Sequence, residues 1–319
     1  MRFSDAYSID RTPKDDWFDV VLSTDTRLFV DPFRIYVDTD VQWRQGHDRL
    51  VAFFNMVLKQ VAKAGANTKS AHWKGAQRLL RFPEPSEFCL GYGDTPLGAG
   101  TGEGIQEGVL AAARETIALG IVSVEHFEEL TLFEDNIGAD RISDIACNVL
   151  KHEFIVYTQL VATRHRIPLQ PIPVPHSSWN EHVEMWEDTK VSLPVNPFTG
   201  RAVLLTPERF LRKLPTVEPE DFWDWSWANQ NQAIRGQFNY DLGKNVDAKT
   251  IARFARINAK LAKRYVESSS RPRTPSPTAP LHGCRCSRRS PRRTSARHGT
   301  SAGRTATHAC VRVQHSRFP

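Results

Sequence analysis

The segment from residue 132 to residue 159, LFEDNIGADRISDIACNVLKHEFIVYTQ, carries the residues best placed to do chemistry. Asp140 opens a predicted helix, where a carboxylate stabilises the positive end of the helix dipole. Asp144 follows one turn later, so the two carboxylates could share a divalent cation such as Mg²⁺ or Mn²⁺, with Glu134 and Asp135 nearby. These acids are the predicted metal and catalytic candidates.

A structural role is the alternative for the same acids. Asp140 would then cap the helix, and Asp144 would pair with Lys151 or Arg141 on a solvated face. Glu153 points into the apolar side of the predicted helix, so its carboxylate should be paired or have a raised pKa, and we expect it to be a third catalytic candidate. One polar face of the helix over 139–164 is predicted to hold Asp140, Asp144, Asn148, Lys151 and Thr158.

A glycine-rich loop precedes this segment. Residues 91–108, GYGDTPLGAGTGEGIQEG, hold seven of the 18 glycines of the chain, between a predicted strand and a predicted helix. Backbone N–H groups in such a loop can cradle a phosphate. No dinucleotide or P-loop fingerprint is present, so the alternative is a surface loop. The predicted ligand-loop residues are Gly98, Gly100, Gly102 and Gly104.

Cations lie along one stripe of the predicted helix over 247–267, opposite an apolar side. Such a stripe could contact a nucleic-acid backbone, although a solvated face is the common alternative. The predicted nucleic-acid-binding residues are Lys249, Arg253, Arg256, Lys260, Lys263 and Arg264.

Two short acidic motifs are weaker candidates. Asp188-x-Lys190, on a predicted strand, has the form of one end of a nuclease metal site. Asp38-x-Asp40 could suggest phosphoryl chemistry. The chain has no serine or cysteine nucleophile motif, and isolated histidines (His72, His126 and His176) show no metal-ligand spacing, so we expect them to be core or surface residues.

These residues must be positioned by an α+β fold that is mostly helical, with a few short strands and an N-terminal β-hairpin. The hairpin is expected over 16–35, and a short buried strand over 86–92. Further strands are expected over 182–195 and 201–206, with an extended connection over 166–180 that could mark a sub-boundary. The predicted helices cover 48–64, 69–81, 104–119, 123–133, 139–164 and 247–267, with short helices after residue 207.

The charge is divided unevenly along the 319 residues. The net charge is +6, yet the segment 268–319 has 11 arginines and no Lys, Asp or Glu, so residues 1–267 hold 31 basic and 36 acidic side chains, a net of −5. The Arg/Ser/Pro-rich segment 268–319 is expected to be disordered, and its composition is typical of GC-rich DNA translated out of frame. We therefore expect a domain over 1–267. No apolar run could span a membrane, no secretory signal is recognised and cysteines are few, which predicts a cytoplasmic protein.

Three segments, SEFCLGYGDTPLGAGTGEGI, LFEDNIGADRISDIACNVLKHEFIVYTQ and VLLTPERFL, resemble a widespread uncharacterised bacterial family. Its members look like the N-terminal region of larger defence-associated proteins, some with a C-terminal restriction-endonuclease-like domain. The resemblance covers residues 15–267 and implies no assigned catalytic residue.

The resemblance implies a sensor or nucleic-acid-handling module of a phage-defence or mobile-element nuclease, with the catalytic domain missing. The alternatives are a stand-alone metal-dependent nuclease or phosphohydrolase, and a non-enzymatic protein-interaction scaffold. DNA, RNA or other defence proteins are the expected partners.

Overall fold

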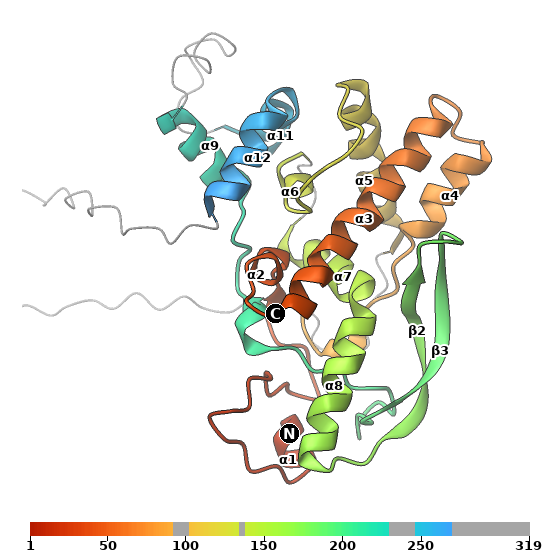
Figure 1. Cartoon of the computed structure of the whole chain (residues 1–319), viewed down its shortest axis with the longest axis vertical. Helices are drawn as coiled ribbons and strands as arrows, with labels where there is room; N and C mark the ends of the chain where they lie inside the picture. Colours follow the sequence, from red (N-terminus) through yellow and green to blue (C-terminus); the bar gives the residue numbers. More distant parts are fainter. Residues whose placement is uncertain (92–101, 134–137, 230–245, 270–319) are drawn as a thin grey trace, which may run out of the picture. The chain divides into compact units, whose positions relative to one another are not determined.

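The computed structural model describes residues 1–91, 102–133, 138–229 and 246–269, and confirms a mainly helical α+β fold (Figure 1). The helices are α1 (Phe3–Ala6), α2 (Pro32–Tyr36), α3 (Val41–Ala64), α4 (Ala71–Leu79), α5 (Gly102–Ala118), α6 (Glu129–Phe133), α7 (Ala139–Val149), α8 (Lys151–His165), α9 (Pro219–Asn229), α11 (Ala248–Ile257) and α12 (Ala259–Ser269), with short 3-10 helices η1 (Ser86–Phe88) and η2 (Glu208–Phe210). The strands are β1 (Phe29–Val30), β2 (Gln170–Asn180), β3 (Met185–Leu193) and β4 (Leu211–Arg212).

Helix α3 is central to the packing of residues 1–273, which form one compact unit. It lies against α2, α4, α5 and α7 (Figure 1). Its apolar side chains recur every three to four residues, which places one face in the core. The buried ones include Trp43, Leu50, Phe53, Phe54, Val57, Leu58 and Val61.

The segment over 16–35, predicted to be a hairpin, is extended around a turn up to Asp31, where α2 follows, and its arms pair with other parts of the chain. Trp17 forms a bridge with Pro207, and β1 pairs antiparallel with β4. The two arms therefore do not form one continuous ladder with each other. The long-range partners, about which local sequence carries no information, decide the pairing.

Asp31 ends β1 by capping the helix that follows it. Its Oδ1 accepts the N–H of Phe33, at 3.1 Å, and Pro32 occupies the first helical position, which its fixed φ favours. The other oxygen, Oδ2, accepts the N–H of Thr216, at 3.0 Å, and a hydrogen bond from the Thr216 hydroxyl. One buried carboxylate thus ties the start of α2 to the segment before α9.

We expect Asp31→Ala to lower the free energy of unfolding by about 2 kcal/mol, because a cap and a buried long-range acceptor are both lost. Asp40→Ala is the matched control, since exposed Asp40 caps α3 through the N–H of Gln42 alone. It should cost about 1 kcal/mol. Urea unfolding of both variants measures the difference. Equal losses would show that the Thr216 contact adds nothing.

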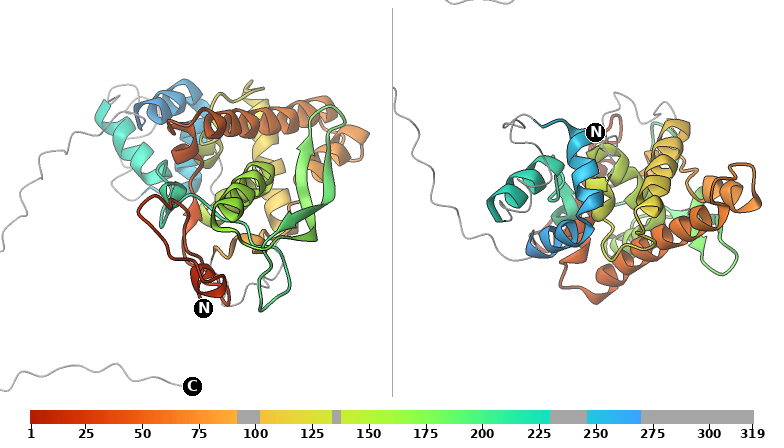
Figure 2. Two further views of the ribbon diagram at one scale, coloured as in Figure 1. Left: turned by 60° about the horizontal axis from the view of Figure 1, so that its bottom comes forward. Right: turned by 90° about the horizontal axis from the view of Figure 1, so that it is seen from above.

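Residues 166–180 were expected to be an extended connection, but most of them form β2, which pairs antiparallel with β3 beside α8 (Figure 2). The β2 prolines at 171, 173 and 175 alternate along the strand, so their missing N–H groups all lie on one side. A two-stranded ribbon leaves that side free, which is why the prolines are compatible with the strand. The strand expected over 182–195 is confirmed as β3.

The segment 86–92 was predicted to be a strand and instead begins with η1. Cys89 follows with φ of +52°, a left-handed conformation that cannot continue a strand, and Leu90 makes a single parallel bridge to Thr26. Residues 201–206 likewise form only one isolated bridge, through Ala202. Both segments are buried and extended over too few residues to build a ladder.

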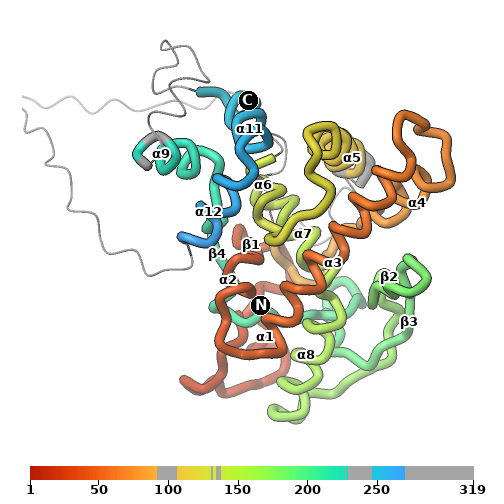
Figure 3. Tube along the Cα trace, turned by 45° about the horizontal axis from the view of Figure 1, so that its top comes forward, coloured from red at the N-terminus to blue at the C-terminus, as the bar shows by residue number. Residues whose placement is uncertain are grey.

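Helices α9, α11 and α12 lie together beside α6 (Figure 3). Trp223 and Trp225 lie on α9. The predicted helix over 247–267 is divided at Asn258 into α11 and α12. No helix in the described ranges has the length and apolar character that crossing a membrane requires.

Candidate functional site

The predicted helix over 139–164 consists of α7 and α8, which meet at Leu150. Its predicted polar face is largely buried: Asn148, Lys151 and Thr158 have no exposed surface. The Asn148 amide donates to the carbonyl of Pro83, and the Thr158 hydroxyl accepts the N–H of Leu205, at 3.0 and 2.9 Å. The solvated-face interpretation is therefore wrong for these three residues, which bind neighbouring chain segments.

Lys151 makes a buried ion pair. Its Nζ lies 3.1 Å from Oε1 of Glu87, on η1, and also donates to the carbonyl of Pro175, on β2, at 3.0 Å. The structural alternative had expected Lys151 to pair with Asp144, but Lys151 pairs with Glu87. The interaction instead joins α8, η1 and β2.

Asp140 and Asp144 lie with two acids from elsewhere in the chain, and we call Asp25, Glu84, Asp140 and Asp144 the acidic quartet. Burial, followed by repulsion from Glu84, Asp140 and Asp25, raises the pKa of Asp144 to about 8. Burial and repulsion from Glu84 and Asp140 raise the pKa of Asp25 to about 7. The carboxylates therefore lie close enough for each ionised group to disfavour ionisation of the others.

Burial and repulsion from Asp140 also raise the pKa of Glu84, and burial raises that of Asp140, an effect that Arg141 opposes. The quartet does not form a group of three or more ligand atoms set to hold a metal among the described residues. Glu134 and Asp135 lie outside those residues, so a metal at Asp140 and Asp144 stays a prediction. Gly98 and Gly100 are also outside them, and the side-chain surroundings of Gly102 and Gly104, on α5, are likewise not described.

Glu153 belongs to a different group from the quartet. Its Oε1 accepts a hydrogen bond from Arg49, on α3, at 2.7 Å, so the expected pairing is present. Because the helix restarts after Leu150, Glu153 faces α3, where it lines a cavity of about 230 Å³ with Trp43 and Arg209. The three predicted catalytic acids therefore do not act as one constellation in the described structure.

The two weaker motifs have structural partners. Asp188 accepts the N–H of His176 within the β2–β3 hairpin, at 2.8 Å. Asp40 caps α3, and Asp38 accepts two hydrogen bonds from Arg209. Capping and pairing account for these carboxylates without metal chemistry.

The predicted basic stripe is partly neutralised. Arg256 pairs with Glu115 at 2.7 Å and also donates to the carbonyl of Phe133. Lys263 pairs with Glu125. The remaining members are exposed and have no ion pair within the described residues; they are Lys249, Arg253, Lys260 and Arg264.

A second basic surface, which the sequence analysis missed, lies between α4 and α5. Lys74, Arg78 and Arg81, here called the α4 cations, line an open pocket of about 320 Å³ with Gln77 and Gln106. The cations are spaced four and three residues apart, so they share one side of α4 and its continuation. This spacing is the signal that could have identified them.

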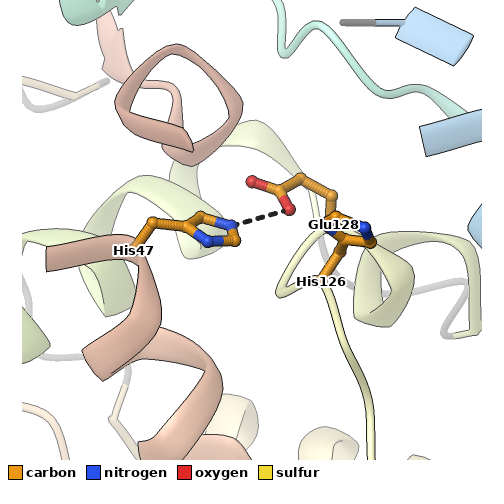
Figure 4. Close-up of side chains that lie close together, drawn as sticks. All are labelled: His47, His126 and Glu128. Atoms are coloured by element: carbon orange, nitrogen blue, oxygen red, sulfur yellow. Dashed lines mark hydrogen bonds and ion pairs between the residues drawn. The ribbon is translucent and has the colours of Figure 1, made fainter. Parts of the chain in front are cut away.

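The one group of three or more ligand-type side chains set to hold a metal, within the described ranges, is His47, His126 and Glu128 (Figure 4). His47 comes from α3, and the other two from the segment before α6. Nε2 of His47 lies 3.1 Å from Oε2 of Glu128, and one ligand atom from each residue lies within 4.8 Å of the others. All three residues are buried, at 2%, 7% and 2% exposure.

Tyr36 packs against both imidazoles of this group, with ring centroids 4.8 Å from His47 and 4.9 Å from His126. Burial lowers the pKa of His126, an effect that Glu128 opposes and His47 reinforces, so the ring favours its neutral form. His126 is buried, in agreement with the expected core position, and folding brings His47 to it from 79 positions away. The spacing His126-x-Glu128 was the only local signal.

The cysteines of the described part are unsuited to nucleophilic chemistry. Burial, with repulsion from Asp25, raises the pKa of Cys89 to about 12, and burial also raises that of Cys147. A thiol with a raised pKa is a poor nucleophile near neutral pH.

Residues 8–218 match a domain family described as a domain of unknown function, DUF8370. This range covers more than half of the chain and includes the acidic quartet, the α4 cations and the group of His47, His126 and Glu128. Comparison with curated proteins and with solved structures gives no match. The chain therefore belongs to the DUF8370 family.

Proposed function

We propose that this domain binds the phosphate backbone of DNA or RNA, as the nucleic-acid-handling part of a larger bacterial defence nuclease of the kind that the sequence resemblance implies. The observation that supports the proposal best is the pocket of the α4 cations, which gathers three positive side chains and, among the described residues, has no carboxylate in its lining.

The chemistry of this pocket suits phosphate. Lys and Arg side chains neutralise phosphate charge, and the two glutamines that complete the lining carry amide N–H donors that can reach phosphate oxygens. Lys74, Arg78 and Arg81 are exposed, so a ligand can reach them. A pocket of about 320 Å³ also has the volume typical of small-ligand sites.

Within the described ranges, the α4 cations differ from several other cations of the chain in their lack of acidic partners. Arg209, Arg256 and Lys263 each pair with a carboxylate, as expected in a region with a net charge of −5 over residues 1–267. The α4 cations make no ion pair among the described residues. Three like charges held together without compensation favour an anion as their partner.

The exposed cations of α11 and α12 support the same function. Helix α5 contacts α4, and its Glu115 pairs with Arg256 of α11. Four exposed cations would add contacts to a DNA or RNA phosphate backbone that extends beyond the pocket; they are Lys249, Arg253, Lys260 and Arg264.

Reversing the charge of the α4 cations (Lys74→Glu, Arg78→Glu, Arg81→Glu) should weaken binding to a short DNA or RNA by about 10–100-fold at moderate salt. The magnitude of the slope of log affinity against log salt should fall by about 2–3, because the variant neutralises about three fewer phosphates and its binding therefore releases fewer counterions. Fluorescence anisotropy over a salt series measures both quantities, for the full chain and for residues 1–273.

A matched control reverses three exposed lysines elsewhere (Lys14→Glu, Lys59→Glu, Lys213→Glu), which changes the net charge equally. It should leave the salt slope within about 1 of the wild type. Equal losses in the two triple variants would mean that net charge alone attracts nucleic acid. Failure of residues 1–273 to bind would leave the protein-interaction scaffold as the better description.

A further inference from the structure

We propose that His47, His126 and Glu128 form a binding site for a divalent transition-metal ion, with Zn²⁺ as the preferred occupant. The site is independent of the proposed nucleic-acid surface, since none of its residues lines the pocket of the α4 cations.

The ligand set fits this class of ion. Two imidazoles and one carboxylate offer two nitrogens and one oxygen, a combination that suits Zn²⁺ and its neighbours in the first transition series. Mg²⁺ and Ca²⁺ prefer oxygen ligands throughout, so they are poorer candidates for this group. Three protein ligands leave a fourth tetrahedral position for water or another ligand.

The distances require only small adjustments. Ligand atoms that each lie about 2.0–2.2 Å from one Zn²⁺ are about 3–4 Å from one another. The His47–Glu128 distance of 3.1 Å is already in this range, and the largest separation in the group is within 4.8 Å. Rotation of the side chains by less than about 1 Å at their tips would complete the site.

A second observation points to an absent ligand. Nδ1 of His126 is buried and has no hydrogen-bond partner in the part of the chain that the structure describes. Buried imidazole nitrogens are normally paired, because an unpaired one loses its contact with water without compensation. The His126 ring therefore holds a nitrogen that no other described group claims, and the residue itself is 93% buried, at 7% exposure.

The position of the site suggests its role. His47 lies within α3, and His126 and Glu128 lie in the segment that leads into α6, which contacts α9, α11 and α12. A bound ion would join α3 to that segment by coordinate bonds. Metal binding should therefore stabilise the packing of α6 and the helices beside it onto the rest of the unit.

Metal binding is measured on the full chain after removal of metal with a chelator. Because segment 268–319 contains Cys284, Cys286 and Cys310, these residues are replaced by Ser in every sample so that thiolates there do not bind Zn²⁺. We expect one equivalent of Zn²⁺ in competition with a chromophoric chelator, and a higher melting temperature with Zn²⁺ than with the chelator.

His47→Gln and His126→Gln should each weaken Zn²⁺ binding by about 100-fold or more, which exceeds the usual effect of changes outside the ligand shell. They should also abolish the Zn²⁺-dependent rise in melting temperature. His72→Gln is the matched control, because His72 is an exposed histidine hydrogen-bonded to Gln60, and it should bind Zn²⁺ like the parent.

Substitution with Co²⁺ identifies the ligands. A site made of nitrogen and oxygen gives d–d absorption without a thiolate-to-cobalt charge-transfer band. Circular dichroism in chelator shows whether each variant folds, and Glu128→Gln provides a further ligand variant where one histidine variant does not. The proposal is overturned if the folded ligand variants bind Zn²⁺ like the parent, if the parent binds none, or if the Co²⁺ spectrum reports thiolate.

Discussion

Lys151→Met should lower the free energy of unfolding by about 3–5 kcal/mol, the largest loss that we expect from one substitution. The substitution leaves the carboxylate of Glu87, which is 7% exposed, without its cation in the core, and it removes the donor to the carbonyl of Pro175. Burying an unpaired charge costs more than the ion pair contributes, because the desolvation penalty is no longer offset. Urea unfolding monitored by circular dichroism measures the loss.

The double variant Lys151→Met/Glu87→Gln separates the two contributions. Removing both charges should recover a large part of the loss, because no uncompensated carboxylate remains. Lys59→Met, at an exposed position of α3, is the control for the change in side-chain type and should cost less than about 0.5 kcal/mol. A loss below about 1 kcal/mol in Lys151→Met would contradict the buried ion pair.

Asp144→Asn should stabilise the protein, and the gain should grow with pH. The pKa of Asp144 is raised to about 8 in the folded chain, by burial first and then by repulsion from Glu84, Asp140 and Asp25. Between pH 4 and pH 8 the folded state therefore binds more protons at this site than the unfolded state, so wild-type stability falls as pH rises. The asparagine side chain of the variant does not ionise, so the stability of the variant does not fall with pH for this reason. We expect no difference near pH 4 and a gain of about 2–4 kcal/mol at pH 8.

Urea unfolding at several pH values measures this gain. The buffers contain EDTA, because Mg²⁺ or Mn²⁺ bound between the carboxylates would offset their repulsion in the wild type. Asp10→Asn, at an exposed position outside the quartet, should change stability by less than about 0.5 kcal/mol at every pH. A gain that is independent of pH would contradict charge repulsion as its cause.

The positions of Asp140, Asp144 and Glu153 bear on the alternative that the chain is a metal-dependent nuclease. Glu153 is paired with Arg49, apart from Asp140 and Asp144, so the three acids do not supply one acid–base site in the described structure. A metal-dependent nuclease at the quartet would also need ligands from outside the described residues, such as Glu134 and Asp135. The nucleic-acid proposal rests on the α4 cations, all three of which lie within the described residues.

The helices could be predicted from the sequence because their causes are local. Apolar side chains repeat every three to four residues over the predicted helix 48–64, which ends before Gly65 with its positive φ, although the helix begins earlier than predicted, at Val41 after the cap Asp40. The break at Leu150 and the left-handed Cys89 were not predicted, because both depend on what packs against them. Strand partners were missed for the same reason: β1 pairs with β4, where Val30 lies opposite Leu211, 181 positions later, and Phe29 lies opposite Arg212.

The sequence by itself determined which residue types are available and how they are spaced. Residues 1–267 have a net negative charge, a few carboxylates occur at helical spacing, and the histidines show no metal-ligand spacing. Only the tertiary structure decided which of them meet. The polar face of α7 and α8 became internal because Pro83, Glu87 and Leu205 supply its hydrogen-bond partners from other segments. His47 reached His126 and Glu128 because α3 and the segment before α6 pack together, and periodicity along one segment cannot encode a meeting between two.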